Sequence, residues 1–116
     1  MQPLKGKHRG GPEAVIQADI VKMMRNYGWF VKETHGNMYQ SGFPDLYCTH
    51  TRYGHRWIEV KLPNMKGSKF TPAQLEDFPK FCANGDGVWI LWAADDKEYA
   101  KLFKPHNWWH FLETFK

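Results

Sequence analysis

The stretch from Gly42 to Lys61 (GFPDLYCTHTRYGHRWIEVK) most constrains the fold, because it holds two strand-like runs on either side of one turn. Residues 45–50 and 56–62 are rich in β-branched and aromatic side chains, and the glycine-containing segment 51–54 joins them. This arrangement predicts a β-hairpin. A turn centred near residue 53 places residue 45 opposite residue 61 and residue 47 opposite residue 59.

The two faces of this hairpin differ in polarity, because successive side chains along a strand point to opposite faces. One face is apolar and predicts contact with a core: Leu46, Cys48, Ile58, Val60 and Leu62. The other face gathers two carboxylates and an amine beside aromatic rings: Asp45, Tyr47, Trp57, Glu59 and Lys61.

Two interpretations of the polar face follow. In the first, the face is solvated and Asp45 forms a cross-strand ion pair with Lys61, worth roughly a few tenths of a kcal/mol. In the second, Asp45 and Glu59 are side-chain ligands of a hard divalent cation, with the backbone carbonyl of Val60 as a third ligand. Glu13 favours the second interpretation, because it lies on the apolar side of the first predicted helix, where complementing the helix dipole does not explain its face.

The rest of the chain predicts one α/β unit, residues 12–116, after a flexible basic arm at residues 1–11. A helix opens at Pro12 and ends at Gly28, and a second one starts at the cap Thr71. The remaining expected elements are a strand at 29–35, a kink at Pro79, a central strand at 87–93 and two short helices in 95–115. The expected architecture is a mixed sheet of about four strands flanked by helices.

Composition favours an anionic partner in a reducing compartment. The chain has 116 residues with a net charge of +4, and its two cysteines are too few for a disulfide framework. We therefore expect a cytoplasmic protein, including the case of a viral or phage protein acting in a host cell. No apolar run of membrane-spanning length occurs, and no secretory signal is expected. Five basic residues are candidate nucleic-acid contacts: Lys5, Lys7, Arg9, Lys66 and Lys69.

The motifs GFPDLY (42–47) and WIEVK (57–61) together resemble the PD-(D/E)XK nuclease superfamily. Within it, the chain resembles the VRR-NUC (virus-type replication-repair nuclease) group, since Glu13 and Gln74 occur in the matching order around these motifs. The resemblance extends over about residues 12–93 and implies a restriction-endonuclease-like core.

The resemblance also implies a role for each site residue. Asp45 and Glu59 correspond to ligands of Mg²⁺ or Mn²⁺, Lys61 to the catalytic lysine, and Glu13 to a residue that supports the metal. Gln74 corresponds to a residue that orients Lys61 or a phosphate. The implied activity is metal-dependent hydrolysis of DNA, and stand-alone members resemble enzymes that resolve four-way junctions.

Several alternatives stay open at this point. Gln74 also fits a capping box with Thr71, in which it bonds back to the backbone at the helix start. A zinc site from Cys48, His50, His55 and His35 has poor ligand spacing. A nucleic-acid-binding module without activity, or a monomeric flap or nicking nuclease, would share the basic surface. Junction resolution instead predicts a homodimer, with the aromatic tail as the candidate interface: Trp108, Trp109, Phe111 and Phe115.

Overall fold

The computed structural model describes residues 11–34 and 42–115, with side chains placed as far as residue 112. The expected basic arm and the end of the first predicted strand therefore lie largely outside the described residues. In chain order the α-helices and strands are α2 (Pro12–Asn26), β1 (Phe30–Glu33), β2 (Leu46–His50), β3 (Gly54–Val60), α3 (Pro72–Ala83), β4 (Val88–Leu91), α4 (Asp96–Ala100) and α5 (Trp108–Phe115). Two short 3-10 helices follow β3 and α4, at Pro63–Met65 and Lys101–Phe103. Among these residues, no helix is long and apolar enough to cross a membrane.

The four strands form one mixed sheet in the order β1-β2-β3-β4. The first three strands form an antiparallel meander, and β4 pairs with β3 in parallel after the crossover through α3. This arrangement confirms the predicted α/β core of about four strands.

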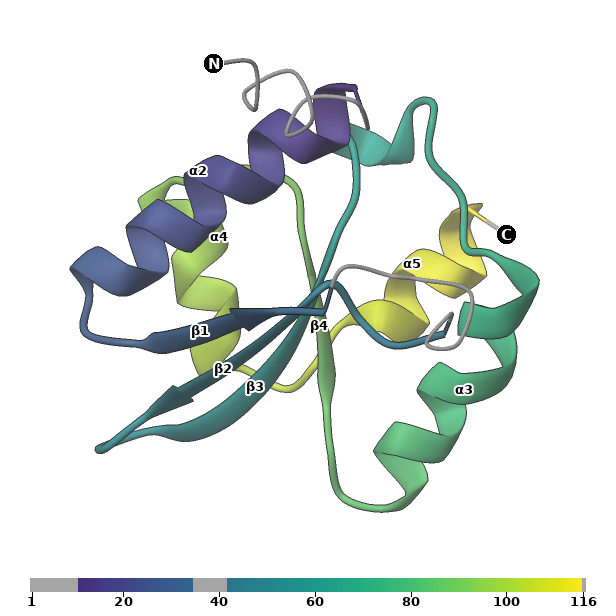
Figure 1. Cartoon of the computed structure of the whole chain (residues 1–116). Coiled ribbons are helices and arrows are strands. Elements are labelled where there is room, and N and C mark those ends of the chain that lie inside the picture. The colour runs from purple at the N-terminus through teal and green to yellow at the C-terminus, as the bar shows by residue number, and fades with distance from the viewer. Residues whose placement is uncertain (1–10, 35–41, 116) are drawn as a thin grey trace.

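Helices cover the two faces of the sheet unequally (Figure 1). On one face α2 and the segment after α4 bury the apolar side of the hairpin, so Leu46 and Ile58 of the hairpin pack in one cluster with Leu102 of that segment. On the other face α3 and α5 pack over β4 and the adjacent side of β3, where Phe78, Ile90 and Trp108 form a second cluster. The described helices leave β1 and β2 uncovered on that second face.

The hairpin register differs from the prediction by one position in the turn. Three residues, 51–53, connect the strands, and His50 pairs with Gly54, so the turn centres on Arg52 rather than Tyr53. Gly54 has a φ of 82°, a left-handed conformation that glycine adopts without strain at the end of a three-residue hairpin loop. The correction moves each cross-strand pair by two residues, so both faces keep their predicted members and Asp45 comes to lie opposite Glu59.

The strand β4 is an edge strand, not the central strand that its apolar sequence predicts. Its side chains are nevertheless covered on both faces, because Leu91 packs into one core cluster and Ile90 into the other. Its outer edge is satisfied by a side chain: the Ile90 N–H donates to Asn107 Oδ1 at 2.7 Å, and Asn107 Nδ2 donates to the Ile90 carbonyl at 3.2 Å. Asn107 thus takes the place of a neighbouring strand.

The aromatic tail packs into the molecule's own core. Trp108 is completely buried, with its ring edge-on to Phe78, and Phe111 is 4% exposed. Trp109 is 46% exposed, and the side chain of residue 115 lies outside the described part. The predicted interface therefore loses two of its four aromatic residues to the interior.

Asn107→Ala is expected to destabilise the fold by about 1–3 kcal/mol, because it leaves the N–H and carbonyl of Ile90 without their partner at a partly buried edge. Asn107→Asp keeps the acceptor for the Ile90 N–H but places a carboxylate oxygen against the Ile90 carbonyl, so it should also destabilise the fold at neutral pH. Urea unfolding of both variants measures the difference. Equal stability of Asn107→Ala and the wild type would show that water replaces the side chain at this edge.

Candidate active site

The candidate site lies where the hairpin meets the start of α3. Asp45 precedes β2, Glu59 is near the end of β3, and Lys61 follows it. Glu59 is 2% exposed, Lys61 4% and Gln74 9%, so these polar groups are enclosed rather than solvated. This burial argues against a solvated polar face, and Lys61 forms its ion pair with Glu59 rather than with Asp45.

Glu59 is the centre of the polar network. Its Oε1 accepts a hydrogen bond from the Asp45 backbone N–H at 3.2 Å. Its Oε2 accepts one from Gln74 Nε2 at 2.7 Å and lies 3.3 Å from Lys61 Nζ. The ion partner of Lys61 is therefore Glu59, two residues earlier in the chain.

Lys61 has three acceptors around its ammonium group. Nζ donates to the Lys69 carbonyl at 2.8 Å and to Gln74 Oε1 at 3.2 Å, in addition to the contact with Glu59. The Phe70 ring lies 5.1 Å from Nζ. Because an ammonium group has three N–H donors, these contacts hold it in one position despite its flexible stem.

Gln74 combines the two roles that the sequence left open. Its backbone N–H donates to Thr71 Oγ1 at 3.1 Å, and its Oε1 accepts from the Thr71 N–H at 3.0 Å, which completes a capping box. The same side chain also bridges Glu59 and Lys61. The cap fixes the side chain that orders the buried pair, so the start of α3 and the site share one residue.

Asp45 is an acid held in an unfavourable electrostatic setting. Burial raises the pKa of Asp45 to about 6, and the Glu13 charge adds to this effect. A hydrogen bond from the Val60 N–H to Oδ2, at 2.8 Å, and the charge of Lys61 act in the opposite direction without cancelling it. A cation placed beside Asp45 would favour its charged form.

Glu59 is in the same situation. Burial is the main cause that raises its pKa well above the ordinary value, and the Asp45 charge raises it further, although Lys61 and Gln74 oppose the change. Two adjacent carboxylates that both resist ionisation suit a divalent cation. Among the described residues no cluster of three or more acidic, His or Cys side chains is arranged to hold a metal. A site with two carboxylates, a backbone carbonyl and water as ligands suits Mg²⁺, which usually keeps several bound waters and rarely binds in a cage made only of protein ligands.

The Val60 carbonyl is on the Asp45 side of β3. The Lys61 N–H bonds to Leu91 of β4, whereas the Val60 N–H bonds to Asp45. The N–H and carbonyl of one strand residue point the same way, so the Val60 carbonyl also faces β2. Its role as a third ligand stays a prediction.

Glu13 reaches the edge of the site through a residue that the sequence did not single out. Ser68 donates a hydrogen bond to Glu13 Oε2 and accepts one from the Leu62 N–H at 3.0 Å. Ser68 thereby links the first turn of α2 to the segment that follows Lys61. A lone serine in a polar loop carries no sequence signal for this contact. Whether Glu13 holds a metal-bound water stays a prediction.

The basic candidates are only partly described. Lys66 and Lys69 are exposed on the loop between β3 and α3, and the Lys69 carbonyl holds Lys61. Lys5, Lys7 and Arg9 lie outside the described residues. The zinc alternative fails for its described members, because no three His, Cys or acidic side chains among the described residues are grouped to hold a metal. Cys48 is completely buried in the core, and His55 bonds to Asp86. His35 is not described.

Comparison with known proteins confirms the predicted resemblance at the level of structure. The chain is similar to a solved structure described as a VRR_NUC domain, with a TM-score of 0.62 and 25% sequence identity over 79% of this chain and 94% of that one. No family model matches the sequence. No curated protein matches it significantly.

The double role of Gln74 predicts different results for the two residues of the capping box. Thr71→Ala removes one cap hydrogen bond and should cost about 1 kcal/mol of stability without changing turnover of a cleavable substrate. Gln74→Ala should cost more, because it also removes one hydrogen-bond partner from each of the buried groups Glu59 and Lys61. Chemical unfolding and initial rates on both variants test this. Equal effects of the two substitutions on rate would mean that Gln74 acts only as a cap.

The raised pKa of Asp45 predicts a pH-dependent stability. Between its ordinary pKa of 3.8 and its folded value of about 6, the folded protein keeps a proton that the unfolded chain has lost. Stability of the metal-free protein should therefore fall as the pH rises through this window, and Asp45→Asn should remove the share of that fall that Asp45 contributes, while the share of Glu59 remains. At about pH 7.5 in chelator, the variant should melt a few degrees above the wild type, and this difference should disappear near about pH 4.

Millimolar Mg²⁺ or Mn²⁺ should raise the melting temperature of the wild type only. A difference in melting temperature between Asp45→Asn and the wild type that does not change with pH would contradict this account.

Proposed function

We propose that this protein is an endonuclease that uses Mg²⁺ or Mn²⁺ to hydrolyse DNA phosphodiester bonds at branched structures. The observation that carries the proposal is the enclosed group of Asp45, Glu59, Lys61 and Gln74, whose two carboxylates resist ionisation beside a fixed ammonium. The similarity to a VRR_NUC domain supports a nuclease of the PD-(D/E)XK type.

The metal would be held by the carboxylates of Asp45 and Glu59 and by the Val60 carbonyl. A divalent cation in such a place lowers the pKa of a bound water and neutralises charge on the phosphodiester. Glu13, on the far side of Ser68, adds negative charge near Asp45 and would orient water at the site's edge.

Lys61 supplies positive charge at a fixed point. Its ammonium is positioned by Gln74 and by the Lys69 carbonyl. The side chain is therefore preorganised to contact a phosphate oxygen or the attacking water, and little rotamer entropy is lost when it does so. All three of its N–H groups have protein acceptors in this structure. Contact with the substrate therefore requires the exchange of one acceptor, and Glu59 is the natural one, since a metal competes for its oxygens.

DNA would approach over the half of the sheet face that no described helix covers. Exposed Lys66 and Lys69 on the loop that follows Lys61 offer phosphate contacts. No segment has the sequence pattern of a base-recognition helix, so we propose selectivity for DNA shape, with a four-way junction as the preferred branch. Symmetric cutting of a junction needs two sites, hence a homodimer.

A second candidate is a monomeric nuclease that acts on flaps or nicks DNA. The burial of Trp108 and Phe111 in the chain's own core favours it, because they are no longer available to an interface. A binding module without activity is the less favoured alternative. It has no need of clustered carboxylates facing an anionic backbone.

Cleavage of labelled duplex, flap, splayed-arm and four-way-junction DNA, with and without Mg²⁺ or Mn²⁺, tests the proposal. We expect metal-dependent cuts in the branched substrates and a loss of at least about 100-fold in rate for Asp45→Asn, Glu59→Gln and Lys61→Ala, as for other groups that stabilise developing charge. Full activity of Asp45→Asn would refute the site. Sedimentation at micromolar concentration decides between the dimer and the monomer.

A further inference from the structure

We propose that an aromatic pocket beside the candidate active site holds one unpaired nucleobase of the DNA, stacked on Phe43 and Phe81. The inference rests on the proposed nuclease function and deepens it. It requires the substrate to carry an unpaired nucleotide next to the bond that is cut, so it concerns branched DNA with flaps or splayed arms and not a fully paired four-way junction.

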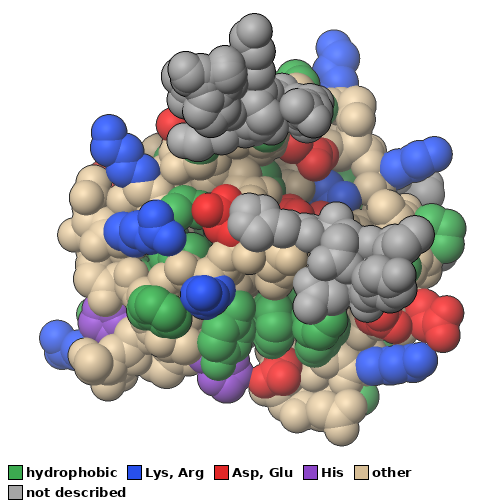
Figure 2. Space-filling view, in the orientation of Figure 1, with side chains coloured by type: hydrophobic (Ala, Val, Ile, Leu, Met, Phe, Trp, Pro, Cys, Tyr) green, Lys and Arg blue, Asp and Glu red, His purple; other side chains and the backbone are tan. Residues whose placement is uncertain are grey.

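The pocket is built on a cluster of partly exposed rings. The ring centres of Phe43 and Phe81 lie 5.6 Å apart, and Trp57 lies 5.8 Å from the first and 5.2 Å from the second. Tyr47 extends the cluster along the sheet, 4.8 Å from Trp57. Phe43 is 39% exposed, so part of its ring is open to a partner. Figure 2 shows hydrophobic side chains in a row on this side of the molecule, with acidic and basic side chains beside them.

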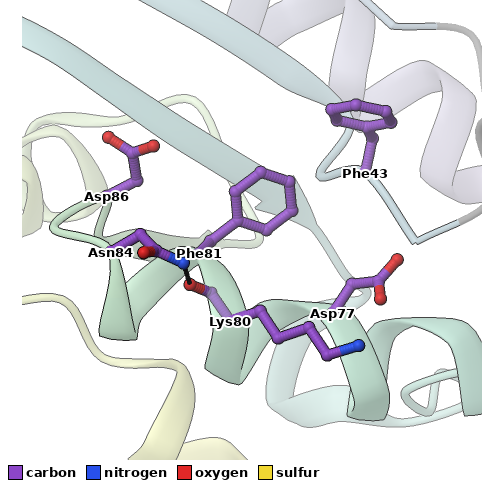
Figure 3. Close-up of a pocket in the computed structure, with 6 residues that line it drawn as sticks. All are labelled: Phe43, Asp77, Lys80, Phe81, Asn84 and Asp86. Carbon is purple, nitrogen blue, oxygen red and sulfur yellow. Dashed lines mark hydrogen bonds between the residues drawn. The ribbon is translucent and has the colours of Figure 1, made fainter.

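A cavity of about 230 Å³ opens between the rings and the second half of α3. Its lining residues are drawn in Figure 3: Phe43, Asp77, Lys80, Phe81, Asn84 and Asp86. The cavity is smaller than the pockets of about 300–1,000 Å³ that take drug-sized ligands, so its size suits a single flat ring system.

The position of the pocket fits the nucleotide next to the scissile phosphate. Trp57 lies two residues before Glu59 on the same face of β3, about 7 Å along the strand. Phe81 lies seven residues after Gln74, about 10 Å along α3. Phe43 is two residues before Asp45. Three segments of the chain therefore connect the site to the rings. The distance between site and rings is similar to the length of one or two nucleotides along a DNA strand.

The charges around the pocket select a base rather than a phosphate. Asp77 and Asp86 lie at opposite ends of the group drawn in Figure 3, and Asp86 is bonded to His55 at 2.8 Å. Carboxylates repel the DNA backbone but accept hydrogen bonds from the amino groups of bases. The cation of the lining, Lys80, is paired with Glu76 at the surface. Stacking on aromatic rings favours no particular base. The pocket would therefore recognise that a base is unpaired rather than which base it is.

Fluorescence of 2-aminopurine tests the pocket without cleavage. The probe is placed as the first unpaired base of a flap and, in a matched DNA, at a paired position of a duplex, and each is titrated with the Asp45→Asn protein. We expect quenching by stacking for the flap only. Adding Phe43→Leu should weaken binding of the flap about fivefold or more, and Phe81→Leu should do the same. Phe103→Leu is the matched control, because Phe103 is 45% exposed in a different ring cluster around Tyr53, and it should change nothing.

Cleavage of an abasic flap separates loss of stacking from damage to the site. The wild type should cut a flap lacking that one base more slowly than the intact flap. Phe43→Leu should slow the intact flap but not slow the abasic flap further, since base and ring form one interaction. Equal quenching with and without Phe43, or equal cutting of both flaps by the wild type, would overturn the inference and leave the nuclease proposal intact. No cleavage of any DNA would refute the proposed function, while the fluorescence still decides whether the pocket binds a base.

Discussion

The burial of Glu59 together with Lys61 is the constraint on which the rest of this structure depends. Removing two charged groups from water is costly, and their mutual attraction repays that cost only when further hydrogen bonds satisfy them. Here Gln74, the Asp45 N–H and the Lys69 carbonyl supply those bonds. Three segments of the chain must converge for the buried pair to be stable. The polar site therefore requires side chains from distant segments to be placed as accurately as those of a hydrophobic core.

The unequal covering of the sheet gives the site its access. One face is closed by α2 and the residues after α4, which provides a rigid support for the hairpin. On the other face α3 and α5 cover only β3 and β4, so the carboxylates lie at the boundary between an enclosed half and an open half. A buried electrostatic group can thus remain within reach of a large polymer.

The sequence predicted well what depends on local pattern. Alternation fixed which side chains share a face of the hairpin, and this survived the error in register because a shift of two residues preserves alternation. Proline and glycine signals placed the limits of α2 and α3 closely. The motifs that carry the VRR-NUC resemblance led to the fold that the structure shows.

The sequence could not predict contacts that depend on the third dimension. The edge position of β4 was missed because a strand covered on both faces has the same apolar composition wherever it lies in the sheet. Asn107 and Ser68 carry no pattern that announces a strand-like edge contact or a link to Glu13. The sequence left two alternative roles open for Gln74. Periodicity cannot show that one side-chain amide both completes the capping box and bonds to Glu59 and Lys61.

The capping box at the start of α3 also has a consequence for how such a chain can diverge. Residues 62–70 connect the strand of Lys61 to the helix of Gln74, and loops of this kind tolerate insertions at little cost in closure entropy. The side chain of Gln74 is positioned by Thr71, three residues away, and not by the length of the loop before it. The loop can therefore lengthen at its exposed middle, around Lys66, and so acquire new substrate contacts, as long as Ser68, the Lys69 carbonyl and the four residues Thr-Pro-Ala-Gln return to the same places beside the sheet.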